Sequence, residues 1–360
     1  MKYIDEYRDR DLIMKLADQI KKSARGEYAF MEVCGGHTAA IHRFGIPSLL
    51  PGNIKLISGP GCPVCVTGTD FIDKAIAYSE KEEVIIATFG DLIRVPGSIA
   101  SLEKKRSTGA DIRIVFSSLD ALEIAKLNPD RKVIFLGIGF ETTAPGTAVT
   151  IKTAEQENIS NFHLLSAHKI MPPAMEAIVR EGVELNGFIC PGHVAAVTGS
   201  SIFSFIPEKY NIGCVITGFE PTDILHSVLM LITQVNRNAP DVEIQYKRAV
   251  TVNGNALAQS HLKEVFEPCD AHWRGFGVIP SSGLALRNGY KRFDAECAMP
   301  VTVMHYEDNI MCICGEILRG KKTPEECPLF KDVCTPENPV GACMVSNEGS
   351  CNTWYKYRII

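Results

Sequence analysis

Cysteines crowd the end of this 360-residue chain at spacings that suit metal binding. The thiols that form the series are Cys312 or Cys314, then Cys327, Cys334 and Cys351. Four thiolates can bind zinc or hold an iron–sulfur cluster, and zinc ribbons usually use two tight C-x2-C pairs, which this segment lacks. The long, irregular spacings therefore favour a 4Fe–4S cluster over zinc. Cys343 falls outside the series, so we do not expect it to be a ligand.

A second pair of thiols lies in the segment GPGCPVC (59–65), before a helical pattern that begins near Thr69. At a helix N-terminus, the dipole and the free N–H groups favour the thiolate form of cysteine. Cys62 and Cys65 are therefore predicted to form a dithiol–disulfide redox couple. The alternatives are half of a zinc site and an inert pair.

A third candidate site is Cys34-Gly-Gly-His37, which directly follows an apolar run at 28–33. The cysteine offers a soft ligand and the histidine a borderline one, so the two could bind a transition metal. The alternative is a glycine turn with a capping histidine. Because Cys34 and Cys62 both follow apolar runs, we favour the functional interpretation.

Other polar residues also follow apolar runs. They are Asp91 and Arg94 in TFGDLIRVPGS (88–98), Glu141 in GFETTAPG (139–146), and His193 in CPGHVAAVTGS (190–200). Ligands of open α/β sheets bind beyond the carboxyl ends of the strands, so we expect these residues to share one cleft with the cysteine motifs. Neither the dinucleotide fingerprint nor the phosphate-binding loop matches these segments, which argues against a nucleotide site.

The elements that position these motifs are predicted by short apolar runs separated by helical patterns. The runs are 28–33, 54–58, 84–90, 112–117, 133–139, 162–167, 187–190 and 214–219. Strands that are apolar from end to end belong in parallel sheets covered on both faces, which predicts an α/β fold. We expect lobes at 1–155 and 156–245, and a C-terminal lobe at 246–360 that carries the cluster.

Composition excludes several classes of protein. A net charge of −5 without a long basic run argues against a nucleic-acid or anionic-membrane partner. The N-terminal segment has no apolar core of a signal peptide, and no apolar run is long enough to span a membrane. Thirteen cysteines in such a chain indicate metal or redox chemistry rather than disulfides, and predict a cytoplasmic protein.

The motifs together resemble the HypD family of nickel–iron hydrogenase maturation factors. They are MEVCGGHT (31–38), GPGCPVC (59–65), GDLIRVPGS (90–98), GFETTAPGTA (139–148), PGHVAAVTG (191–199) and the cysteine-rich tail. The resemblance implies two Rossmann-like lobes with parallel sheets and a smaller lobe with a 4Fe–4S cluster. It also implies a HypC-like small chaperone and a HypE-like cyanide donor as partners.

By the same resemblance, Cys34 holds a mononuclear iron with His37 beside it, while the Fe(CN)2CO unit is assembled. Cys62 and Cys65 are then the redox pair, and the tail cysteines are the cluster ligands. One departure is that family members often read CGGHTH, whereas Ala39 follows Thr38 here. The predicted function is that of a scaffold and electron-transfer protein rather than a free-substrate enzyme. The alternatives are an iron–sulfur-dependent protein disulfide reductase and a zinc-stabilised binding module.

Overall fold

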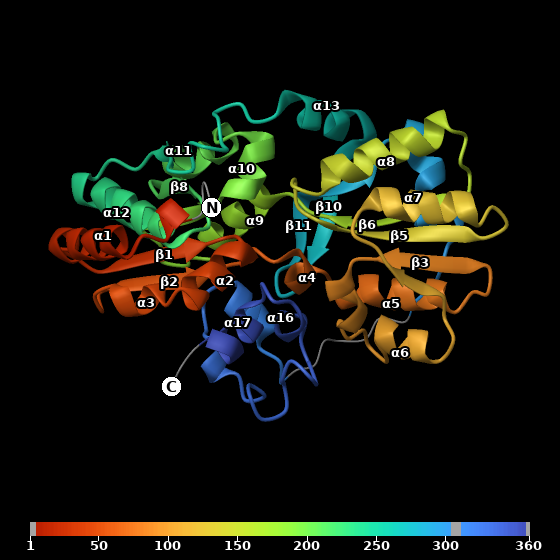
Figure 1. The fold of residues 1–360 in the computed structure, drawn as a ribbon, viewed down its shortest axis with the longest axis horizontal. Coiled ribbons are helices and arrows are strands. Elements are labelled where there is room, and N and C mark those ends of the chain that lie inside the picture. The colour runs from red at the N-terminus through yellow and green to blue at the C-terminus, as the bar shows by residue number, and fades with distance from the viewer. Residues whose placement is uncertain (1–4, 304–310, 358–360) are drawn as a thin grey trace.

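The computed structural model describes residues 5–303 and 311–357. Two parallel sheets lie toward opposite ends of the long axis, and the cysteine-rich C-terminal segment lies beneath their junction in Figure 1. Each apolar run predicted to be a strand forms one, so the predicted α/β class is confirmed.

The first sheet has five strands, all parallel, in the order β2-β1-β7-β8-β9. Its strands are β1 (Tyr28–Glu32), β2 (Ile54–Ser58), β7 (Gly187–Pro191), β8 (Gly213–Thr217) and β9 (Val242–Ile244). The helices on one face are α1 (Arg10–Ser23), α2 (Gly35–Arg43), α3 (Ile46–Leu49) and α12 (Pro221–Arg237). Those on the other face are α9 (Met171–Arg180), α10 (Gly192–Thr198) and α11 (Phe205–Tyr210). Both faces are therefore covered, as fully apolar strands require.

The second sheet has four strands, also parallel, in the order β4-β3-β5-β6. Its strands are β3 (Val84–Thr88), β4 (Ile112–Ile114), β5 (Lys132–Gly139) and β6 (Phe162–His168). Its helices are α5 (Thr69–Ser79) and α6 (Leu102–Ser107) on one face, and α7 (Ser118–Leu127) and α8 (Ala144–Gln156) on the other (Figure 1). β5 is buried from Val133 to Gly139 because helices cover it on both sides.

The sheets do not follow the lobe boundaries expected along the sequence. β1 pairs with β7, with Phe30 opposite Gly187, so the first 58 residues complete a sheet whose other strands lie beyond residue 186. A boundary at 155 would also separate β5 from β6, which pair from Val133–Phe162 to Gly139–His168. Periodicity along the chain predicts strands, but which strands pair depends on packing between distant segments.

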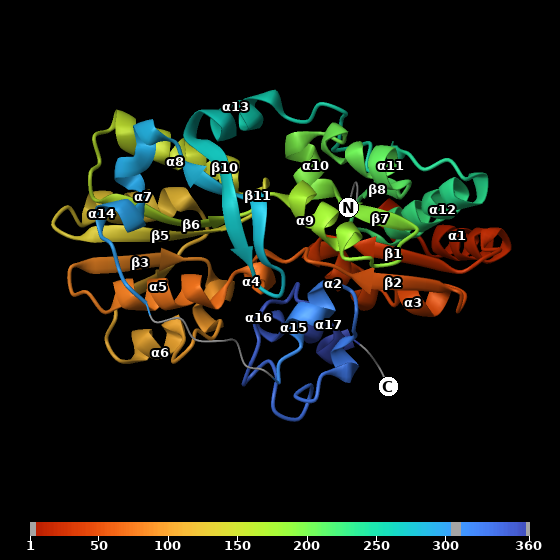
Figure 2. The same cartoon turned by 180° about the vertical axis from the view of Figure 1, so that it is seen from behind.

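The sequence predicted a single lobe at 246–360, but the structure divides this segment into two parts. Helix α13 (Ala256–Val265) packs on α8, and the antiparallel hairpin of β10 (Phe266–Trp273) and β11 (Gly277–Leu286) packs on β6 (Figure 2). This part therefore belongs with the second sheet. The short helices that follow are η4 (Asn288–Phe293) and α14 (Ala295–Ala298).

The C-terminal unit, residues 311–357, is made of short helices and loops. Its elements are α15 (Cys314–Leu318), η5 (Pro324–Glu326), α16 (Ala342–Val345) and α17 (Ser350–Tyr357). Helix α17 packs on α2, which follows Cys34, and α16 packs on α4 (Pro63–Val66), which carries the C-x-x-C motif. The unit thus touches both cysteine motifs of the α/β lobes. Its buried residues belong to one apolar cluster shared with both sheets.

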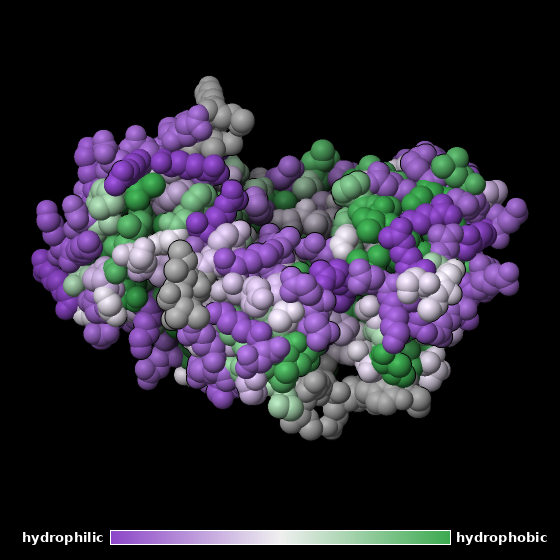
Figure 3. All heavy atoms as spheres, turned by 60° about the horizontal axis from the view of Figure 1, so that its bottom comes forward, coloured by the Kyte–Doolittle hydropathy of each residue, from purple (hydrophilic) through white to green (hydrophobic). Residues whose placement is uncertain are grey.

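Three short 3-10 helices complete the described elements: η1 (Asp5–Tyr7), η2 (Gly90–Arg94) and η3 (Ser201–Phe203). Among the described residues, no helix is long and apolar enough to cross a membrane. The face in Figure 3 is mostly hydrophilic, and its hydrophobic residues gather in several separate groups.

Candidate thiol and metal site

Cys34 lies at the point where β1 ends and α2 begins. The backbone N–H groups of Gly36 and His37 point toward its sulfur from the first turn of α2. The loop after β2 lies directly against it, since Gly35 N–H donates to Gly61 O at 3.0 Å. A Cβ atom added to Gly61 would lie only 2.1 Å from Cys34 N, so this approach requires glycine. The two cysteine loops predicted from sequence therefore meet.

The environment of Cys34 favours the thiol over the thiolate. Burial, and then the carboxylate of Glu348, raise the pKa of Cys34 to about 12, against the opposing backbone N–H groups of Gly36 and His37. A metal ion bound at Cys34 must therefore displace a proton, which makes such binding pH-dependent.

His37 is fully buried and has one ring nitrogen without a partner. Its Nε2 lies 3.2 Å from Thr217 O and 3.0 Å from Gly218 O. Both partners are acceptors, so we assign the proton to Nε2, which leaves a lone pair on Nδ1. Nδ1 is buried and has no hydrogen-bond partner. Burial lowers the pKa of His37 to about 4, so the ring is neutral at pH 7 and its free nitrogen could ligate a metal.

An aromatic ring that the sequence did not single out links His37 to His193. Phe219 stacks on His37 at a centroid distance of 4.5 Å, and on His193 at 4.0 Å. His193 is therefore placed beside the Cys34 loop by packing, although it follows β7 in the chain.

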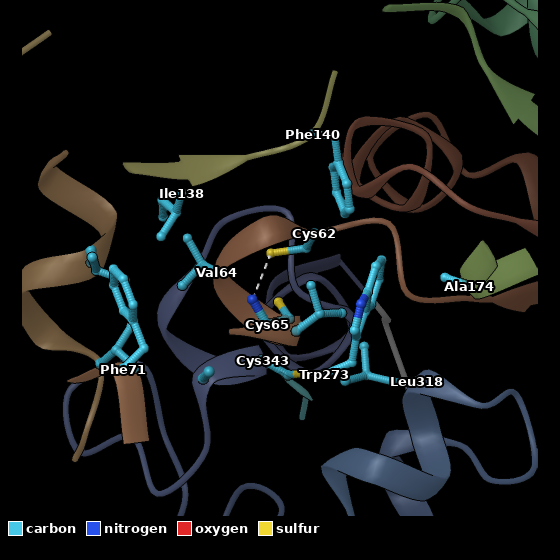
Figure 4. Close-up of a cluster of buried hydrophobic side chains, with 14 of the residues drawn as sticks. Cys62, Val64, Cys65, Phe71, Ile138, Phe140, Ala174, Trp273, Leu318 and Cys343 are labelled. Carbon is cyan, nitrogen blue, oxygen red and sulfur yellow. Dashed lines mark hydrogen bonds between the residues drawn. The ribbon is translucent and has the colours of Figure 1, made fainter. Parts of the chain in front are cut away.

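Cys62 and Cys65 are buried side by side in the core (Figure 4). Cys62 caps α4, and its sulfur accepts the Cys65 N–H at 3.3 Å. Burial and hydrogen bonds to Cys343 and Cys62 raise the pKa of Cys65 well above its ordinary value. Burial therefore opposes the thiolate form that this helix N-terminus was expected to favour at Cys65. Helix α4 has only four residues, too few for a substantial dipole.

The low-pKa thiol belongs to Cys343 instead. Hydrogen bonds from Cys314 and Cys65 lower the pKa of Cys343 to about 6, against the effect of burial. Cys343 lies at the centre of Figure 4 beside Cys65. Sulfur contacts therefore run from Cys62 through Cys65 and Cys343 to Cys314. The spacing of the tail cysteines excluded Cys343 as a cluster ligand. Nothing in the sequence alone indicates that it lies between the Cys62–Cys65 pair and the other tail cysteines.

The remaining tail cysteines gather mainly around Cys314. Its sulfur lies 3.3 Å from that of Cys312, and it also hydrogen-bonds with Cys351. Cys334 accepts the Val340 N–H at 3.3 Å in the same region. Cys327 packs at the border of the shared apolar cluster.

The tail thiols have the donor chemistry of a 4Fe–4S cluster, since such clusters are held by cysteine thiolates. In the described part of the chain, however, no group of three or more Cys, His, Asp or Glu side chains is arranged to hold a metal ion. Cys312 and Cys314, the two alternatives for the first position of the series, lie with their sulfurs 3.3 Å apart.

A pocket of ≈ 340 Å³ joins the carboxyl ends of strands from both sheets. Cys34, Asp91 and His193 line it, as the prediction of a shared cleft requires. Glu348, from the C-terminal unit, also lines it and was not singled out in the sequence.

Arg94 and Glu141, which were also predicted for this cleft, do not line the pocket. The Arg94 guanidinium donates to the carbonyl oxygens of Pro336 and Glu337, so it holds the C-terminal unit. Glu141 is buried, and its Oε1 accepts the Met171 N–H at 3.0 Å, at the start of α9. Burial raises the pKa of Glu141 to about 7.

These features define a two-lobed α/β protein with a thiol-containing pocket between its lobes and a cysteine-rich unit docked beneath it. The family model of the HypD proteins, described as the hydrogenase formation hypA family, matches residues 11–358. The chain belongs to the HypD family.

Relatives across bacteria and archaea cover nearly the whole chain. Hydrogenase maturation factor HypD2 of Bradyrhizobium diazoefficiens is 46% identical over 99% of this chain and 97% of its own length. A putative hydrogenase expression/formation protein of Methanocaldococcus jannaschii is 46% identical over 98% of this chain and 99% of its own. Hydrogenase maturation factor HypD of Escherichia coli is 42% identical over 99% and 98%, respectively.

Proposed function

We propose that this chain is a hydrogenase maturation factor that holds iron as cargo at Cys34 while the Fe(CN)2CO unit of a nickel–iron hydrogenase is assembled. The observation that carries the proposal is the continuity of the site. The tail thiols contact Cys65 through Cys343, and the loop that carries Cys62 and Cys65 contacts the backbone of Cys34. One folded unit thus offers a cargo ligand and a path of redox-capable groups leading to it.

The cargo role rests on the donor set of the pocket. A soft thiolate suits an iron ion that carries cyanide and carbon monoxide. His37 has a free Nδ1, but it is not among the residues that line the pocket. By family resemblance, a HypC-like chaperone would supply a further thiolate, and a HypE-like protein would deliver cyanide. The free state of all thirteen cysteines fits a reducing compartment, and we propose the cytoplasm.

The redox role belongs to the buried thiols. A 4Fe–4S cluster bound by tail cysteines would supply electrons one at a time. Cys62 and Cys65 would form a disulfide with the loss of two electrons and two protons, and would regain them on reduction. Cys343 lies nearest to this pair, so we add it to the tail residues that could hold the cluster.

A diffusible protein disulfide is a poorer substrate for this pair. Cys62 is 3% exposed and Cys65 is 0% exposed, whereas thiol–disulfide exchange needs direct attack of one sulfur on another. The reductase alternative would therefore require the core around α4 to open.

Infrared spectroscopy of the complex purified anaerobically with its partners tests the proposal. The wild-type complex should show cyanide and carbonyl bands, and Cys34→Ala should lose them while it keeps the tail cluster and the partners. Cys297→Ala is the matched control, because Cys297 is exposed and lies outside the site. Unchanged bands in Cys34→Ala would show that the iron is held elsewhere.

A further inference from the structure

Glu348 brings a carboxylate from the C-terminal unit to the Cys34 turn. It lies in the loop between α16 and α17, and its side chain rests on Gly35. A Cβ atom on Gly35 would lie 2.6 Å from Glu348 Cβ and 2.9 Å from its Oε2. Glycine at position 35 therefore makes room for this carboxylate beside Cys34.

A second carboxylate, that of Asp91, lines the same pocket from the lobe of the second sheet. Asp91 lines the pocket together with Glu348, and Ser346 links them: its hydroxyl donates to Asp91 Oδ2 at 3.4 Å and accepts the Glu348 N–H at 3.2 Å. Both side chains are exposed to solvent, so an ion can reach them. Among the described residues, neither carboxylate forms an ion pair with a cationic side chain.

The pocket therefore concentrates electron-rich groups without a compensating cation. Glu348 and Cys34 line the same pocket, and the Glu348 side chain rests against Gly35, the residue that follows Cys34. A divalent ion would relieve the repulsion between the carboxylates and stabilise the Cys34 thiolate. Binding would form a metal–sulfur bond and a metal–oxygen bond, and would release the thiol proton to solvent.

We propose that Glu348 is a specificity-determining ligand of the Cys34 pocket, which adds a hard oxygen donor so that the site selects divalent iron over softer thiophilic metals. Thiolate-only sites favour ions such as copper(I) and zinc, whereas carboxylate oxygen suits harder divalent ions. The inference rests on the proposed iron cargo and names the residue that selects it. Because Glu348 belongs to the C-terminal unit, iron capture also depends on the docking of that unit.

Cobalt(II), a spectroscopic substitute for iron(II), tests the assignment in anaerobically purified protein with its cluster intact. Glu348→Gln should bind cobalt about tenfold more weakly, lose less affinity for zinc, and keep the sulfur-to-cobalt charge-transfer band. Asp91→Asn should lose affinity in the same direction. Glu337→Gln is the matched control, because it removes the same charge from the same unit at a position that does not line the pocket.

The outcomes separate this inference from the proposed function. Equal cobalt affinity in wild type and Glu348→Gln, or equal losses for cobalt and zinc, would overturn the role of Glu348. Retention of the charge-transfer band in Cys34→Ala would instead overturn the cargo site itself. Circular dichroism and cluster absorbance of each variant show whether it has folded.

Discussion

At the scale of single residues, the balance between burial and local hydrogen bonds decides which protonation state each candidate group favours. His37 and Cys343 are both buried, yet the ring of His37 is kept neutral by desolvation, whereas donated hydrogen bonds lower the pKa of the Cys343 thiol. For Glu141, burial raises the pKa of the carboxyl group, and only the backbone N–H groups of Met171 and of Glu141 itself oppose that effect. Residue type and position in a motif could not have separated these cases.

Glu141 should make the protein less stable as the pH rises. Its pKa of about 7 in the fold lies above the ordinary value of 4.5, so the folded state holds a proton that the unfolded chain releases between these values. The stabilisation from this proton is complete below pH 4.5 and is lost as the pH rises through 7. The linked change is roughly 3 kcal/mol between pH 4 and pH 8.

Denaturant unfolding of Glu141→Gln at pH 5 and pH 8 measures this effect. The variant should have a smaller loss of unfolding free energy between the two pH values than the wild type. Glu208→Gln, at an exposed helical position, should match the wild type. An identical pH dependence in Glu141→Gln and wild type would show that Glu141 is ionised throughout.

At the scale of elements, the C-terminal unit depends on docking against the two α/β lobes rather than on its own helices. Helix α16 has four residues and α17 has eight, which is too short for either to be stable alone in water. Their partners are α4 and α2, the helices of the two cysteine motifs. Loss of metal binding in the tail should therefore loosen the contacts at the Cys34 pocket as well.

Cys343→Ala should reduce the iron–sulfur absorbance of anaerobically purified protein and make the last ~40 residues sensitive to protease, because metal binding there is coupled to folding. The spacing of the cysteines predicts that Cys343 is not a ligand and that the cluster stays intact in this variant. Its contacts with Cys65 and Cys314 indicate that it is a ligand, so the measurement decides between the two. Cys334→Ala should have the same effect, and Cys297→Ala none. Full cluster content in Cys343→Ala would restrict that residue to a packing role.

At the scale of the whole molecule, contacts between distant segments bring three parts around one pocket. One apolar cluster extends through both sheets and the C-terminal unit, and Arg94 adds polar contacts to Pro336 and Glu337. These contacts place Glu348 against Gly35.

Arg94→Ala should speed hydrogen exchange in the segment 335–349 while leaving the two sheets protected. The lost hydrogen bonds are to backbone carbonyls of that unit, and a bond from a charged donor contributes ~1.5–3 kcal/mol. Arg106→Ala, in the last turn of α6, is the control. If Arg94→Ala left exchange unchanged but abolished iron uptake, Arg94 would belong to the pocket as the sequence first suggested.

The sequence by itself determined the elements and the points at which their loops carry chemistry. Apolar runs and helical patterns are local, so the strands, the α/β class and the position of Cys34 directly after β1 followed from them. Only the tertiary structure decided that β1 pairs with β7, that Cys343 lies between Cys65 and Cys314, and that Glu348 rather than Arg94 lines the pocket. The physical reason is that strand pairing and side-chain contacts of this kind join residues tens to hundreds of positions apart, whereas periodicity and spacing report only on near neighbours.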